Sequence, residues 1–151
     1  DKQAGAWNFL GGVKLKTDDN STSASLHVVT GDYRETINAN RTRSTLLINH
    51  DFTDRIHFTF QHDYVFQDQQ LLLLGKTAHW YGINNFLTYN FNDDLKAGIR
   101  AEWLRDHDRV RVLESARGGA LNASSGYYAI TGGINWKPVG WLTIRPEVRY
   151  D

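Results

Sequence analysis

Six histidines are the residues of this sequence that most readily suggest a metal site or a catalytic base. His57 and His62 would point to opposite faces of a strand, because side chains alternate along it, so they could not share an ion. The other four are His27, His50, His79 and His107, which lie in separate segments. None shows the close, regular spacing of a metal-binding motif. We therefore expect no metal site.

Serines could serve as nucleophiles, and cysteine is absent. The serines at 21, 23, 115, 124 and 125 lie in segments that resemble turns. None of them lies in the G-x-S-x-G pattern that places a nucleophile at a sharp strand-to-helix turn. A Ser-His-Asp hydrolase is therefore disfavoured.

Two glutamates could form an acid–base pair. Glu102 and Glu147 would lie on the same face of neighbouring strands, but arginines stand two residues away from each of them, at Arg100, Arg145 and Arg149. Because residues at i and i+2 share one face of a strand, this pattern favours ladders of neutralised charge. We expect no catalytic residues and no cofactor, and we interpret the protein as not being an enzyme.

Overall charge and hydropathy narrow the class of protein. The 17 basic and 17 acidic residues cancel, which argues against a nucleic-acid-binding protein with a basic face. No stretch of eighteen apolar residues is present, so a transmembrane helix is excluded. A membrane-spanning strand is not excluded, because its polar and apolar residues alternate.

Alternation of polar and apolar residues is the dominant pattern, and it predicts strands. It is clearest at 142–150, where Leu142, Ile144, Val148 and Tyr150 share one face. Other well-patterned segments are 56–67, 80–91, 95–104 and 127–137; weaker ones are 5–17, 22–30 and 41–50. The prediction is an all-β antiparallel up-and-down sheet of about eight strands.

The connections alternate in length. Short turns rich in Asp, Asn, Gly and Pro are expected at 17–21, 52–54, 92–94 and 137–140. Longer polar links are expected at 31–40, 67–77 and 105–125. Short turns on one side and long loops on the other are typical of bacterial outer-membrane barrels.

The apolar faces have matched lengths and aromatic ends. Each face spans eight residues in the better-patterned strands, roughly 26 Å at about 3.3 Å per residue, near the apolar band of such barrels. We predict membrane-interface aromatics at one rim, Trp7, Tyr64, Tyr81, Trp103, Tyr128 and Tyr150, and at the other, Tyr89, Phe91 and Trp136. A packed soluble core would instead place its largest side chains at the centre.

The opposite face carries charges of both signs. If the sheet is the wall of a barrel, these side chains line a water-filled path; in a soluble protein they would be a solvated surface. The predicted pore-lining residues are Lys96, Arg100, Glu102, Arg145, Glu147 and Arg149.

Two segments carry a resemblance to a known family. They are YGINNFLTYNFNDDLKAGIRAEWLRDHDRVRV (81–112) and GYYAITGGINWKPVGWLTIRPEVRYD (126–151). Their turn, glycine and polar-face positions resemble the putative β-barrel porin-2 family of bacterial outer-membrane proteins, which upstream residues resemble only in pattern. The resemblance implies a presumed pore-forming transmembrane barrel in the outer membrane. Members are longer and return to a final strand with an aromatic end, so residues 1–151 are expected to be one domain that is part of a longer barrel.

The expected function is passive diffusion of small hydrophilic solutes through an outer-membrane channel. The expected partners are the lipid bilayer and further barrel strands or subunits, with no nucleic acid. Two alternatives remain open from sequence: a non-conducting structural or adhesive membrane barrel, and a soluble β-sandwich that acts as a binding module.

Three local features do not fit a regular strand pattern. Leu71 to Leu74 interrupt a polar link, which suggests either a loop folded against the barrel mouth, a continuation of the preceding strand, or a contact surface for another subunit. Pro146 lacks the N–H that a ladder needs, so a bulge is expected there. Gly132 is expected to relieve crowding where a large side chain crosses it.

Overall fold

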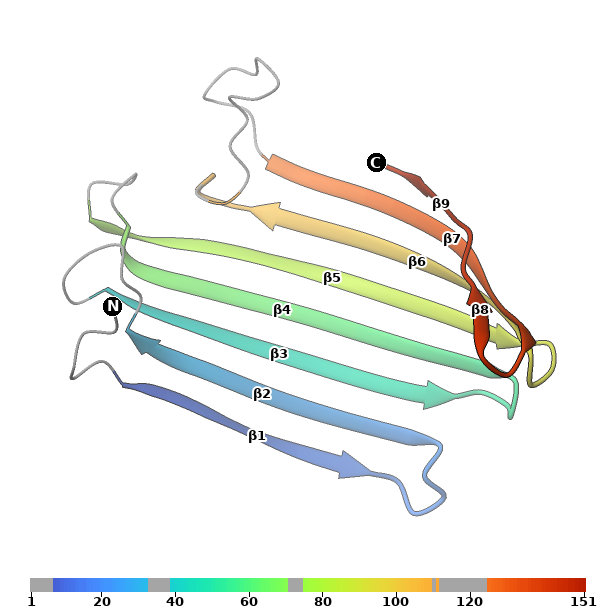
Figure 1. The fold of residues 1–151 in the computed structure, drawn as a ribbon. Coiled ribbons are helices and arrows are strands. Elements are labelled where there is room, and N and C mark those ends of the chain that lie inside the picture. Colours follow the sequence, from blue (N-terminus) through green and yellow to red (C-terminus); the bar gives the residue numbers. More distant parts are fainter. Residues whose placement is uncertain (1–6, 33–38, 71–74, 110, 112–124) are drawn as a thin grey trace.

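A computed structural model describes residues 7–32, 39–70, 75–109, 111 and 125–151. The described strands are β1 (Asn8–Lys16), β2 (Thr22–Asp32), β3 (Asn40–Asp51), β4 (Ile56–Gln70), β5 (Lys76–Asn90), β6 (Leu95–Asp106), β7 (Ser125–Val139), β8 (Leu142–Ile144) and β9 (Glu147–Tyr150). They form one antiparallel sheet in chain order, with β8 and β9 both paired to β7 (Figure 1). In the described part of the chain, no helix is long and apolar enough to cross a membrane.

All eight predicted strands are present, and the predicted antiparallel up-and-down fold is confirmed. Turns of two to five residues connect the strands at one end of the sheet, here named the short-turn end, and β2, β4 and β6 end at the opposite end, here named the long-link end (Figure 1). Within the described residues no ladder joins β1 to β8 or β9, so the sheet is open and has two edges.

The eighth predicted strand is interrupted at Pro146, which separates β8 from β9. The predicted bulge at this proline is wrong. Trp136 pairs with Ile144 and Gly133 pairs with Glu147 in one unbroken register, and the shift lies instead between Trp136 and Val139. The Ile134 N–H still donates to the Pro146 carbonyl at 3.2 Å, but proline cannot return the bond because it lacks an N–H. Pro146 therefore leaves out one hydrogen bond of the ladder on the outermost strand and causes no bulge there.

The link predicted at 67–77 is shorter than expected, because β4 and β5 continue into it. Gln67 pairs with Ala78 and, after a register shift, Gln70 pairs with Lys76. The Thr77 hydroxyl donates to the Asp68 carboxylate at 2.9 Å across the two strands. Polar side chains therefore extend this hairpin beyond the point where the apolar alternation ends. The four leucines at 71–74 lie outside the described residues.

The register keeps each strand's faces in phase across the whole sheet. Ile48 pairs with Phe60, Leu87 pairs with Ile99, and Ile99 pairs with Gly132, so the apolar stripes join into one surface, here named the apolar face. The other surface, here named the polar face, carries the residues that alternate with them. Since a slip of one residue would exchange the faces of a strand, the hydrophobic pattern itself specifies this register.

The expectation for Gly132 is also wrong. A Cβ at Gly132 would meet nothing within 4 Å, whereas one at the neighbouring Gly133 would lie 3.0 Å from the Glu147 side chain and 3.1 Å from the Pro146 carbonyl. Gly133 faces the polar side and pairs directly with Glu147. The crowding is therefore on the polar face, one residue further along.

Candidate functional site

Burial in this sheet is the reverse of that in a soluble β-sandwich. Large apolar side chains stay exposed on the apolar face, with Val148 at 79% and Tyr128 at 71% of full exposure. Among the described strand residues, the buried ones are Ser25, Gly31, Val65, Gln67, Ala78, Gly82, Asp106 and Thr131, all on the polar face. A sandwich packs its apolar face against a second sheet, but the described strands form a single layer. The geometry is that of a barrel wall with an apolar exterior and a polar interior.

Three of the predicted pore-lining residues form a charge ladder across β6 and β9. One oxygen of Glu102 accepts from the Arg149 guanidinium at 2.8 Å and contacts Nε of Arg100 at 3.0 Å. Arg149 also donates to Asp151 at 2.7 Å, and Arg100 lies 3.5 Å from the Thr131 hydroxyl. Each charge is held by an opposite charge, so the side chains keep fixed orientations above the sheet.

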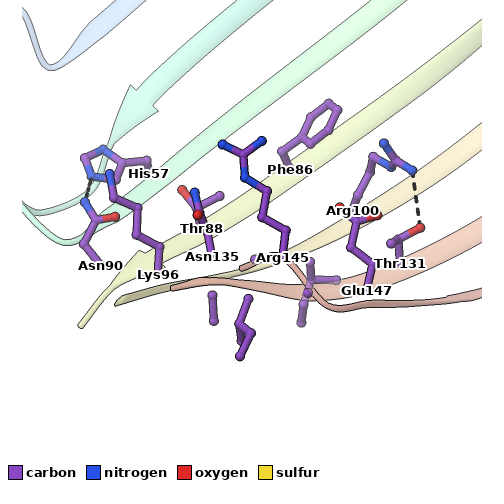
Figure 2. A pocket seen from close by; sticks show the side chains of 15 residues that line it. His57, Phe86, Thr88, Asn90, Lys96, Arg100, Thr131, Asn135, Arg145 and Glu147 are labelled. Atoms are coloured by element: carbon purple, nitrogen blue, oxygen red, sulfur yellow. Dashed lines mark hydrogen bonds between the residues drawn. The ribbon is translucent and has the colours of Figure 1, made fainter. Parts of the chain in front are cut away.

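The other three predicted residues lie at the short-turn end of the same face. Lys96, Arg145 and Glu147 line an open groove of about 570 Å³, with Arg100 at its far side (Figure 2). Figure 2 shows their side chains on one side of the sheet. All six predicted pore-lining residues therefore share the polar face, in two adjoining groups.

A second ladder, on β3 and β4, was not predicted. Nε and a terminal nitrogen of Arg43 both donate to one oxygen of Asp63, at 3.0 and 2.7 Å. The Thr45 hydroxyl donates to the same oxygen, and the Gln61 amide donates to the other at 2.6 Å. Arg43 lies in a segment whose apolar alternation is weak, and its i, i+2 spacing from Arg41 and Thr45 is the signal that could have indicated a shared polar face.

A cluster around Trp80 was also missed. The Arg111 guanidinium lies 4.2 Å from the centre of the Trp80 ring, and that of Arg41 lies 5.5 Å from it. Both arginines donate to the side-chain oxygen of Gln67, which is fully buried. The backbone N–H of Arg111 donates to Asp106 at 2.8 Å. A residue beyond the end of β6 is thereby fixed on the polar face, near the long-link end.

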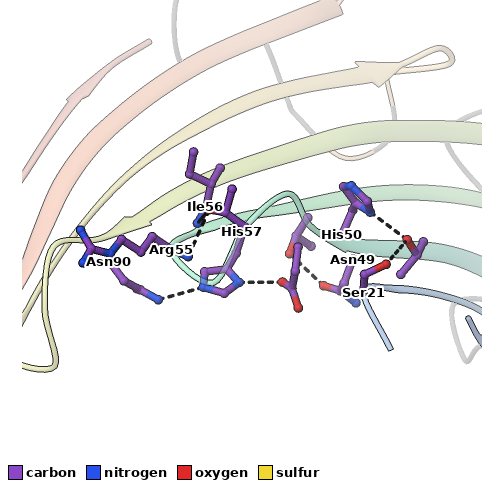
Figure 3. Close-up of polar contacts among 11 residues, drawn as sticks. Ser21, Asn49, His50, Arg55, Ile56, His57 and Asn90 are labelled. Carbon is purple, nitrogen blue, oxygen red and sulfur yellow. Dashed lines mark hydrogen bonds and ion pairs between the residues drawn. The ribbon is translucent and has the colours of Figure 1, made fainter. Parts of the chain in front are cut away.

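His57 is held at the short-turn end of the sheet by two side-chain contacts. Its Nδ1 lies 2.6 Å from Asp51, and its Nε2 lies 2.8 Å from the side-chain amide nitrogen of Asn90 (Figure 3). An amide that donates to Nε2 leaves the ring proton on Nδ1, facing the carboxylate. Both ring nitrogens are engaged, so His57 links β3, β4 and β5.

The predicted aromatics of the first rim form a row across the apolar face. Ring centres of Tyr64 and Tyr81 are 6.2 Å apart, those of Tyr81 and Trp103 are 5.7 Å apart, and those of Trp103 and Tyr128 are 6.5 Å apart. Tyr150 is exposed on β9, and Trp7, which directly precedes β1, is exposed as well. The row crosses β4 to β7 on the side of the sheet nearer the long-link end.

At the short-turn end the aromatics are less continuous. Tyr89 and Phe91 make an edge contact at 4.8 Å, and Trp136 is exposed on the same face. Trp141, in the turn between β7 and β8, is 86% exposed and was not predicted. It lies outside the alternating segments, so periodicity gave no signal for it.

The fold and the arrangement of its faces define a membrane β-barrel wall. The sequence profile of one family, described as putative beta-barrel porin-2, OmpL-like, matches residues 1–151. The chain belongs to this family of porin-like outer-membrane barrels, and the match covers the upstream half as well as the two hairpins that carry the resemblance in sequence. No curated protein and no solved structure matches the chain.

Proposed function

We propose that this protein forms part of the wall of an outer-membrane channel through which small hydrophilic solutes diffuse passively. The apolar face contacts lipid in the bacterial outer membrane, and the polar face lines the aqueous path. The protein carries out no chemical reaction on the solute.

The reversed burial is the observation that carries this proposal. In water, exposed apolar surface costs about 25 cal/mol per Å², and the apolar face presents side chains such as Leu15, Val148 and Tyr150 without protein cover in the described strands. A bilayer removes this cost. The polar face carries charged residues of both signs, held in ladders. Because burying charge away from water is costly in free energy, such a face suits a hydrated path better than a dry interior.

A conducting path also sets the size of the barrel. Eight strands closed alone leave an interior that side chains fill, and the polar face here carries long ones, including Arg43, Arg100 and Arg149. The channel wall therefore includes further strands, supplied by the same chain or by another subunit.

Ion selectivity in planar bilayers tests the proposal. Reversing Arg145 and Arg149 together to glutamate should shift the reversal potential in a salt gradient toward cation selectivity. The matched control reverses Arg55 and Lys76, two exposed cations at strand ends, and should have a smaller effect. A protein that inserts but carries no current, or a channel whose selectivity the Arg145/Arg149 reversal leaves unchanged, contradicts the proposal.

A further inference from the structure

The polar face carries two glycines where β6 and β7 meet, and the side chains of Thr88 and Glu147 approach to within 3.2 and 3.0 Å of where a Cβ would lie at Gly98 and Gly133. Gly98 and Gly133 are direct register partners, so two adjacent positions on this face carry no side chain. Both line the groove near the short-turn end, and they are here named its floor. The floor is backbone, and the residues around it form the walls.

Cations stand on both sides of this floor. Lys96 lies two residues before Gly98, and Arg145 follows Ile144, the register partner of Trp136, on the adjoining strand. Arg100 lies two residues after Gly98. Among the described residues, Arg100 is paired with Glu102, but Lys96 and Arg145 have no ion-pair partner. Two cations are therefore available to a ligand on the short-turn side.

One carboxylate and several neutral groups also line the groove. Glu147 pairs with Gly133 and lies at the edge of the floor, also without an ion-pair partner in the described part of the chain. Asn135 is the register partner of Lys96, and Phe86 lies under Arg100 with 6.0 Å between the ring centre and the guanidinium. The groove thus has an excess of positive charge, hydrogen-bonding groups and one apolar surface.

We propose that this groove is a binding station for small polyhydroxy carboxylates. The carboxylate lies between Lys96 and Arg145, hydroxyl groups donate to Glu147 and Asn135, and the carbon chain passes over the glycine floor. The volume of about 570 Å³ lies in the range of small-molecule sites. This inference names the solute class of the proposed channel and rests on that function for its physiological meaning, but the binding itself does not require conduction.

Binding to the detergent-folded protein is the direct test, with D-gluconate as the anionic probe and sorbitol as its uncharged counterpart. Saturation-transfer NMR should show gluconate binding at millimolar concentration and much weaker sorbitol binding. Arg145→Gln and Lys96→Gln should each weaken gluconate binding by about fivefold or more, since each removes a charge-assisted contact. Glu147→Gln should tighten it, because a hydrogen-bonding group remains while the repelling charge is lost.

The control is Lys14→Gln, which removes a cation from the polar face of β1, outside the groove; its gluconate affinity should equal that of the wild type. Equal binding of gluconate and sorbitol overturns the inference, as does an unchanged affinity in Arg145→Gln. A general loss of structure would weaken binding in every variant, so the tightening in Glu147→Gln separates recognition from folding. Gluconate binding by a protein that carries no current in bilayers would refute the channel and leave the binding station in place.

Discussion

Glu102 is the central acceptor of the ladder on the polar face, and its removal should destabilise the sheet measurably. One of its oxygens contacts both Arg100 and Arg149, at 3.0 and 2.8 Å. The Glu102 side chain is 25% exposed, while Arg149 is 47% exposed, so solvent screens part of the attraction. Exposed pairs of this kind contribute about 0.2–1 kcal/mol each, so Glu102→Gln should lower the free energy of unfolding by at most about 2 kcal/mol.

The measurement is equilibrium unfolding by urea in lipid vesicles, followed by tryptophan fluorescence. A double-mutant cycle of Glu102→Gln with Arg149→Gln isolates the pair and should give a coupling free energy of about 0.5 kcal/mol or more. Raising the salt from 0.1 M to 1 M shortens the screening length from about 10 to about 3 Å, so the coupling should shrink. The same cycle between Glu102 and Lys14, which lie on distant strands, should be additive. Additive behaviour in the Glu102–Arg149 cycle at low salt would refute the ladder.

Three further perturbations test other parts of the structure. Trp80→Ala should lower the free energy of unfolding by about 3 kcal/mol, since it removes a large packed ring and the surface on which Arg41 and Arg111 lie; Trp80→Phe should cost less, and equal urea midpoints for the two variants would contradict the stacking. Hydrogen bonds to Asp19, from the Thr17 hydroxyl at 2.6 Å and then from the backbone and hydroxyl of Ser21, hold its pKa below the ordinary value of 3.8. The folded state therefore favours the charged form of Asp19. The stabilisation that this gives is present above pH 3.8 and is lost as the pH falls through the lowered pKa of the folded state. An Asp19→Asn variant with the same loss of stability at every pH would contradict this. Ile99→Arg, at the middle of the apolar stripe of β6, should destabilise the protein in vesicles by about 2–4 kcal/mol, and a deficit no larger than that of Thr88→Arg on the polar face would contradict the assignment of the faces.

The strands, their faces and the ends at which turns lie could be predicted because all three depend on local periodicity. In β6, for example, alternation alone separates Ile99 and Trp103 from Arg100 and Glu102, and neighbouring strands align because their apolar faces must coincide. Such patterns also placed the six candidate pore-lining residues on one face.

What the sequence could not predict depends on contacts between distant segments. The Trp80 cluster joins Arg41, Gln67 and Arg111 from three parts of the chain, and no spacing within one strand indicates it. The groove requires Gly98 and Gly133 to be opposite each other, which only the register of β6 and β7 determines. A bulge was expected at Pro146 because proline lacks an N–H. The position of the register shift depends instead on how β7 pairs with β8 and β9.

The central claim is that one face of the sheet contacts lipid and the other contacts water. The sequence has no cysteine, so single cysteines along β7 can carry a spin label without other changes. In vesicles, labels at Ile130, Gly132 and Ile134 should be accessible to oxygen, which partitions into lipid, and labels at Ala129, Thr131 and Asn135 should be accessible to a water-soluble nickel chelate. Accessibility that alternates with a period of two in this sense is the predicted result; uniform or reversed accessibility would contradict the account.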